Sequence, residues 1–166
     1  MDRQPVLRAL VGLLLATLAL TSCGLSVPAD PEDTLERVTQ GTLRVGVSPQ
    51  PPWTGVDADG EPTGPEIDLV TGFAERLDAE VDWVVGGEEQ LVTLLEHGDL
   101  DLVVGGFTAD TPWSEQAAVT RPYHEGVDAT GESVELVMLA RMGENAFLRD
   151  LETFLHEWEQ RQDQGR

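Results

Sequence analysis

The sequence predicts an α/β domain with a mainly parallel sheet, one antiparallel return strand and flanking helices. Short apolar strands alternate with helices between residues 43 and 104, an order typical of a parallel sheet covered by helices. A mostly apolar run at 134–140 suits a further buried strand. The chain then closes with an amphipathic stretch, which needs a hydrophobic partner and is expected to pack on the sheet.

The first strand is expected at 43–47, where the alternation ends in a proline-rich loop at 49–53. The Asp-Gly pair near residue 60 supplies turn chemistry. A helix follows at 66–77, and its apolar residues recur at helical spacing. These residues are Val70, Phe73, Ala74 and Leu77.

A short strand at 81–85 and a helix at 88–97 form the next unit, and Gly98 is the expected stop of that helix. A third strand is predicted at 100–104, leading into Gly105-Gly106. These elements complete the alternation that predicts the parallel sheet.

The second half of the chain is less regular. We expect a loop at 107–115, a brief extended segment at 119–123 and a polar turn at 126–132. The final helix begins after Gly143 and is predicted to fray after Trp158. Its apolar stripe consists of Phe147, Leu148, Leu151, Phe154, Leu155 and Trp158.

The amino-terminal segment has the layout of a secretory signal. Arg3 and Arg8 precede an apolar run at 11–20 that is too short to span a bilayer. The Leu-Thr-Ser-Cys sequence ending at Cys23 resembles the lipobox of bacterial lipoproteins, which implies a lipid on that cysteine and an extracytoplasmic, membrane-anchored protein. The alternative is a cleaved signal followed by an unpaired cysteine. With cleavage before Cys23, residues 1–22 are the signal peptide.

The remaining chain is long enough for one domain with one core. We expect a tether over residues 23–40, the domain over 41–160 and a disordered tail over 161–166. The formal net charge is −21 and there is no lysine. Such a surface repels nucleic acid and anionic lipid headgroups, so neither is an expected partner.

The chemistry-bearing residues are sparse. Cys23 is the only cysteine, which excludes an intrachain disulfide, and the histidines at 97, 124 and 156 are scattered. No nucleophile elbow, phosphate loop or dinucleotide fingerprint is present. We therefore expect no metal, no cofactor and no enzyme activity.

An ordered set of short motifs carries a resemblance to a known family. The motifs are Leu43-Arg44-Val45-Gly46-Val47, Pro51-Pro52-Trp53, Asp59-Gly60, Gly64-Pro65-Glu66-Ile67-Asp68-Leu69, Gly98-Asp99-Leu100-Asp101-Leu102, Gly105-Gly106-Phe107-Thr108 and Pro122-Tyr123. Together they resemble the first lobe of family 3 extracytoplasmic solute-binding proteins, the receptors of amino-acid ABC importers. The match covers about residues 41–124, and 134–158 resembles the family's closing strand and helix. The resemblance implies one lobe of a type II periplasmic-binding-protein-like fold.

The chain departs from this family in length. The second lobe, normally about a hundred residues, is replaced by a junction at 125–133. Family members grip solute between two lobes by hinge closure. This chain has only one of the two walls of that cleft, so we expect weak binding. An ABC permease or a second binding-protein chain is the expected partner that would complete the site.

The second departure concerns the carboxylate grip. Family members that bind amino acids carry an arginine after the Gly-Gly-x-Thr-like turn, because its planar fork holds a carboxylate. An ungapped alignment puts Trp113 at that position, and Arg121 is the only nearby arginine. Amino-acid specificity therefore does not follow from the resemblance.

The candidate ligand-binding residues each have a structural alternative. The resemblance makes Trp53 the aromatic that sandwiches solute, although loop packing also explains it. Thr108 and the amides near Gly106 are candidate hydrogen-bond donors, and Trp113 is a candidate at the rim. Arg121 either binds a ligand or neutralises nearby acids.

Glu66 and Asp68 are interpreted as acids that stabilise the amino end of the following helix through its dipole; the alternative is direct ligand contact. Two function classes remain open. The first is a solute-binding component of ABC-type uptake with weak or partner-dependent binding. The second is a non-transport scaffold lipoprotein or a non-functional deletion derivative.

Overall fold

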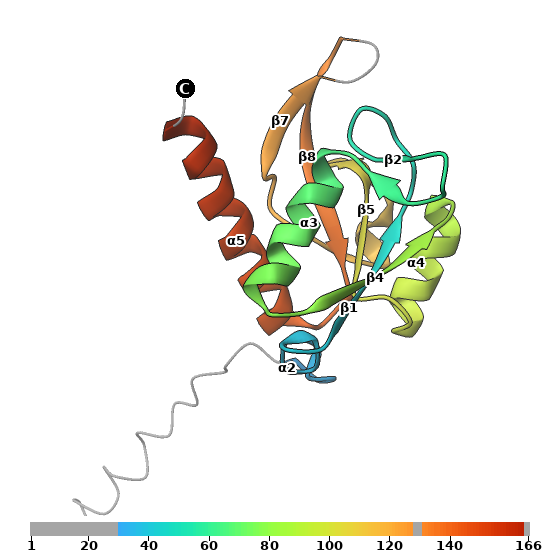
Figure 1. Ribbon diagram of the computed structural model, residues 1–166, viewed down its shortest axis with the longest axis vertical. Helices are drawn as coiled ribbons and strands as arrows, with labels where there is room; N and C mark the ends of the chain where they lie inside the picture. The colour runs from blue at the N-terminus through green and yellow to red at the C-terminus, as the bar shows by residue number, and fades with distance from the viewer. Residues whose placement is uncertain (1–29, 128–130, 165–166) are drawn as a thin grey trace, which may run out of the picture.

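The computed structural model describes residues 30–127 and 131–164. Its centre is a six-stranded sheet in the order β4-β1-β5-β8-β6, with β7 also paired to β8 (Figure 1). The predicted signal peptide, Cys23 and most of the predicted tether lie outside the described residues.

The parallel part of the sheet consists of β1 (Thr42–Val47), β4 (Glu80–Val85) and β5 (Leu102–Thr108). β1 lies between the other two and is parallel to both. The alternating apolar residues of β1, Leu43, Val45 and Val47, are fully buried and point into the core on the α3 and α5 face of the sheet. The α/β alternation predicted from the sequence is confirmed.

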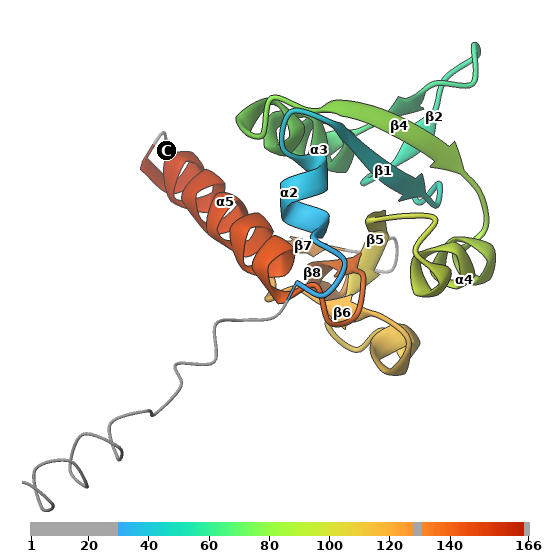
Figure 2. The same ribbon diagram turned by 90° about the horizontal axis from the view of Figure 1, so that it is seen from below.

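Helices cover both faces of the sheet. α3 (Pro65–Arg76) packs with α5 (Asn145–Gln164) on one face, and α4 (Glu88–His97) covers the other. Figure 2 shows α4 on the opposite side of the sheet from α2 and α5. The short antiparallel pair of β2 (Gly55–Val56) and β3 (Pro62–Thr63) stands beside the main sheet.

The return strand β8 (Ser133–Ala140) is antiparallel to β5, as the sequence predicts. Its other edge carries β6 (Ala118–Val119) and then β7 (His124–Val127). The turn predicted from residue 126 begins later, because Gly126 and Val127 still pair with Val134 and Ser133. β7 and β8 therefore form a hairpin where the family resemblance implies a second lobe.

The final helix extends further than predicted. α5 runs to Gln164, whereas the sequence predicts fraying after Trp158 and disorder from residue 161. The tail consists largely of glutamate, glutamine and arginine, which are good helix formers. The side chain of Gln160 also lies 2.8 Å from the His156 ring one turn earlier. Toward its amino end the helix buries Phe147 and Leu151.

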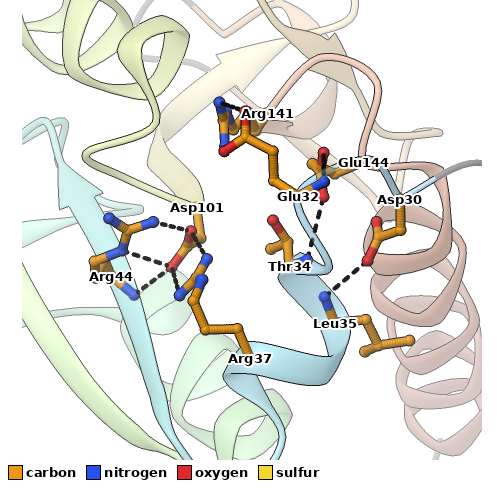
Figure 3. Close-up of polar contacts among 9 residues, drawn as sticks. All are labelled: Asp30, Glu32, Thr34, Leu35, Arg37, Arg44, Asp101, Arg141 and Glu144. Atoms are coloured by element: carbon orange, nitrogen blue, oxygen red, sulfur yellow. Dashed lines mark hydrogen bonds and ion pairs between the residues drawn. The ribbon is translucent and has the colours of Figure 1, made fainter.

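A network of ion pairs lies at the amino ends of the parallel strands (Figure 3). Asp101 is fully buried, and its Oδ1 lies 2.5 Å from Arg37 Nη2 and 2.6 Å from Arg44 Nη2. Burial alone raises the pKa of the Asp101 carboxyl, but hydrogen bonds from Arg44 and Arg37 outweigh it and leave the pKa below its usual value. Asp101 therefore joins α2 (Thr34–Val38), β1 and β5.

At the same end of the sheet, hydrogen bonds and an ion pair hold residues 30–35, the segment that leads into β1. Glu144 is buried and accepts a hydrogen bond from the backbone N–H of Thr34 at 3.2 Å. Asp30 accepts one from the N–H of Leu35 at 2.9 Å, and Arg141 pairs with Glu32. We call these contacts, with Asp101 and its two arginines, the amino-end network.

Candidate ligand-binding cleft

A polar cleft lies at the carboxyl ends of β1, β4 and β5, the edge where open α/β sheets bind ligands. Its volume is about 310 Å³. The lining residues are Gln50, Glu88, Gly105, Gly106, Phe107, Thr108, Asp110, Thr111 and Pro112. The segments that follow β1 and β4, together with the end of β5 and the loop after it, thus contribute to one depression.

The Gly105-Gly106 turn shapes the floor of the cleft. The sequence places this pair after the third strand, but β5 continues to Thr108 with a register irregularity between Val103 and Phe107. Gly106 has φ +63°, and a Cβ there would lie 2.6 Å from the Trp53 ring. Only glycine fits this conformation and contact, so the turn keeps backbone, not side chain, at the cleft surface.

Hydrogen bonds orient the two carboxylates of the cleft. Thr108 Oγ1 donates to Asp110 at 2.5 Å, and the indole N–H of Trp113 donates to Glu88 at 3.1 Å. Trp113 belongs to the 3₁₀ turn η1 (Pro112–Glu115) that follows β5. No arginine or histidine is among the described lining residues. The cleft thus presents negative charge without a basic side chain.

Beneath the cleft, the buried carboxyl of Glu66 joins two segments through hydrogen bonds that were not predicted from the sequence. Its carboxyl accepts hydrogen bonds from the Tyr123 hydroxyl at 2.5 Å and from the Gly106 N–H at 2.9 Å. Burial raises the pKa of this carboxyl, and hydrogen bonds from Tyr123 and the Gly106 and Gly105 amides offset that effect only partly. Burial and the neighbouring Glu66 also raise the pKa of the Tyr123 hydroxyl.

Glu66 does lie in the first turn of α3, as expected. Its carboxyl, however, binds Tyr123 and Gly106, so the expectation that it acts mainly on the helix dipole is incomplete. A signal for this existed in the sequence. Glu66 precedes Val70 by four residues and Phe73 by seven, which places it on the apolar stripe of the helix.

The structure brings three of the five predicted site residues to one place. Gly106 and Thr108 line the cleft, and Trp113 lies at its edge through the hydrogen bond to Glu88. Gln50 and Glu88 also line the cleft but were not among the residues predicted from the sequence. Their position after parallel strands was a usable signal, because those strand ends meet at one edge.

The other two predicted residues lie elsewhere. Trp53 lines a separate apolar cavity on the α3 and α5 face of the sheet. Arg121 has a side chain that is 73% exposed, and its Nε lies 3.0 Å from Glu152 of α5. It therefore neutralises an acid of the last helix and does not contribute to the cleft lining.

Other classes of site find no support among the described residues. Within 30–127 and 131–164, no group of three or more histidine, cysteine, aspartate or glutamate side chains is placed to hold a metal ion. The helices of this part of the chain include none with the length and apolar character needed to cross a membrane.

Comparison with known proteins decides the family. Residues 43–163 match the family described as bacterial extracellular solute-binding proteins, family 3. The chain belongs to this family. Among similar curated proteins, a probable histidine-binding protein of Campylobacter jejuni is 27% identical over 89 residues, which is 54% of this chain and 35% of that protein. ABC transporter arginine-binding protein 1 of Escherichia coli is 29% identical over 84 residues, or 50% of this chain and 35% of that protein.

Our family 3 protein thus spans little more than a third of these curated relatives. Solved structures include a better match in size. The arginine-bound form of domain 1 from TmArgBP is 26% identical with a TM-score of 0.64, covering 74% of this chain and 97% of that one. A phenylalanine-to-tryptophan mutant of the same domain gives 25% identity, a TM-score of 0.66 and coverages of 75% and 97%. The fold is therefore that of a single lobe.

Proposed function

We propose that this chain is a one-lobed solute-binding protein that presents a cationic solute to an ABC-type uptake system. The observation that carries the proposal is the cleft with Glu88 and Asp110 but no basic side chain in its described lining. At about 4 Å, opposite unit charges near a protein surface attract by about 4 kcal/mol before desolvation costs. A cationic group is thus the solute feature that this lining favours.

The names of the relatives support this solute class. The curated relatives are a probable histidine-binding protein and an arginine-binding protein of an ABC transporter. Domain 1 of TmArgBP was solved in an arginine-bound form, so a single lobe of this family can hold a basic amino acid. We extend the same class of solute, and the same transport context, to our chain.

The proposed solute need not carry an α-carboxylate. The family resemblance places an arginine where this chain has Trp113, and the described cleft lining contains no guanidinium to grip a carboxylate. Each hydrogen bond of an exposed cleft contributes about 0.5–1.5 kcal/mol net. We therefore expect affinity no tighter than about 1 mM for the single wall.

Titration calorimetry with agmatine, arginine and glutamate tests the proposal. Agmatine has the guanidinium of arginine without the carboxylate, so we expect it to bind at least as well as arginine, and glutamate to bind least. Glu88→Gln and Asp110→Asn should each weaken agmatine binding by removing an attractive charge. Glu89→Gln is the matched control, since Glu89 is exposed beside Glu88 but does not line the cleft.

Two results would contradict the proposal. One is glutamate binding as tightly as agmatine, and the other is an equal loss of affinity in Glu89→Gln and Glu88→Gln. Absence of binding by all three solutes would favour the alternative of a scaffold lipoprotein or a deletion derivative.

We further propose that Cys23 is lipidated and anchors the protein outside the cytoplasm. The support is the lipobox-like sequence with a sole cysteine. Growth of a bacterial host with radioactive palmitate should label the wild-type chain and leave Cys23→Ala unlabelled. Equal labelling of both, or of neither, would contradict the anchor. Two or more acyl chains are needed for stable anchoring, at about 0.8 kcal/mol per buried CH₂.

A further inference from the structure

A second cavity lies on the α3 and α5 face of the sheet, and it shares no lining residue with the polar cleft. Its volume is about 160 Å³. In Figure 1, α3 and α5 diverge toward the β7–β8 hairpin, and the cavity lies in this region, with walls from all four elements. Its principal lining residues are Trp53, Leu69, Tyr123, His124, Leu136 and Trp158.

One wall is a row of three rings. The centroids of Trp53 and His124 are 6.1 Å apart at an interplanar angle of 71°, and those of His124 and Trp158 are 6.3 Å apart at 76°. These are edge-to-face arrangements, which aromatic rings favour. The three rings come from the loop after β1, from β7 and from α5, so the wall depends on the complete fold.

Two glycines fix the Trp53 ring in this wall. A Cβ at Gly126 would lie 2.5 Å from Trp53 Cη2, and a Cβ at Gly106 would lie 2.6 Å from its Cδ1. The indole therefore lies directly against the backbone of β7 and of the Gly-Gly turn. Because both contacts exclude any larger residue, the cavity wall is preformed and does not need a ligand to arrange it.

The carboxyl at the edge of the cavity is already engaged. Glu66 uses one oxygen to accept from Tyr123 and the other to accept from Gly106. The neighbouring lining from Leu69 and Leu136 is apolar. An apolar cavity offers water few hydrogen-bond partners, and a dry cavity of about 150 Å³ is large enough to bind benzene.

We propose that this cavity is a second binding site, for one uncharged apolar group the size of a single aromatic ring. The ring row supplies edge and face contacts to such a ring, and both oxygens of Glu66, the one acid of the described lining, already accept hydrogen bonds from Tyr123 and Gly106. The site is independent of the proposed function, because the cleft and the cavity share no lining residue. Ligands for the two sites can therefore be tested separately.

Benzene titrated into the full chain tests the proposal by NMR. We expect a saturable chemical-shift change at the Gly126 amide and nuclear Overhauser contacts between benzene and the ring protons of Trp53 and Trp158. Leu69→Phe and Leu136→Phe each fill the cavity and should abolish the saturable change. Thr108→Ala, in the polar cleft, is the control and should leave it intact.

Several outcomes would overturn the proposal. One is a wild-type protein that shows no benzene contacts to Trp53 or Trp158, a result that requires no variant to fold. Another is an undiminished shift in a filled variant with a native amide spectrum. Tetramethylammonium, a cation of comparable size, is titrated in parallel. Its binding in preference to benzene would assign the cavity to cations and refute an apolar site.

Discussion

The two ends of the sheet each bury a carboxylate, but they surround it with different partners. At the amino end, Asp101 lies between the guanidinium groups of Arg37 and Arg44. At the carboxyl end, Glu66 meets only uncharged donors, the Tyr123 hydroxyl and the Gly106 amide. The pKa of Asp101 is therefore lowered, whereas burial raises the pKa of Glu66. The charge of the partners, and not burial alone, decides the direction.

The acids at the amino end of the sheet contribute to stability, whereas those at the carboxyl end are available for binding. The amino-end network pairs Asp101 and Glu32 with arginines and joins α2, β1 and β5. The cleft at the other end keeps Glu88 and Asp110 exposed without a basic partner among its described lining. Internal neutralisation stabilises the fold, while an unneutralised acid at the opposite edge remains available to a solute.

Removal of the amino-end carboxylate should have the largest effect on stability. Asp101→Ala leaves two guanidinium groups without their shared partner, and breaking a buried pair typically costs about 3–5 kcal/mol. Urea unfolding should show this loss. Asp99→Ala, at an exposed position two residues earlier, should stay within about 0.5 kcal/mol of the wild type. Equal losses in both variants would refute the special role of the amino-end network.

The core between the two ends can be weakened without touching either carboxylate. Leu151 of α5 is 1% exposed, so Leu151→Ala should cost about 2–5 kcal/mol through the cavity it leaves. The same urea experiment measures it. A change below about 0.5 kcal/mol would show that α5 is not docked on the sheet.

The opposite pKa shifts predict opposite pH dependences. For Glu66 the folded-state pKa is raised above its usual 4.5, so its contribution to stability is full below that pH and is lost as pH rises through the folded value. For Asp101 the pKa is lowered from 3.8, so its contribution is present above that pH and is lost as pH falls.

Glu66→Gln isolates one half of this comparison. The variant removes the titrating group, so its stability should decline less than that of the wild type as pH rises above 4.5. Glu61→Gln, at an exposed position in the turn between β2 and β3, is the control and should follow the wild type. If Glu66→Gln and wild type show parallel stability profiles, the raised pKa is refuted.

The smallest effect is expected for Arg121→Ala. Its side chain is 73% exposed and pairs with Glu152 at 3.0 Å. Surface pairs of this kind contribute about 0.2–1 kcal/mol and are screened by salt. Thermal unfolding at low and high salt should show a small difference that shrinks as salt is added. A loss comparable to that of Asp101→Ala would erase the contrast between surface and buried pairs.

Periodicity predicted most of the fold because it reports which face of an element is buried. It correctly predicted the strand at residues 43–47 and the helix at 88–97, while the mostly apolar run at 134–140 correctly predicted a further buried strand. Periodicity could not predict which of Asp99 and Asp101 forms the buried ion pairs. The arginines that bind Asp101 lie 57 and 64 residues away along the chain. Pairing across such distances leaves no local pattern.

The candidate site was predicted less completely than the fold. The Gly-Gly turn and Thr108 were found through a motif, and both line the cleft. Trp53 was selected from its loop, yet the direction of its ring depends on Gly126, which lies in a segment predicted to be a turn. A loop position thus identified the right edge of the sheet but not the cavity that the side chain enters.

The β7–β8 hairpin has a consequence for how this architecture can be rebuilt. Val127 and Ser133 are antiparallel partners, so the chain leaves and re-enters the sheet at points about 5 Å apart. A folded unit whose own termini lie close together can be spliced between them without altering the register of β5 and β8. This single junction is therefore a natural place to insert a fluorescent domain and convert the lobe into an optical sensor.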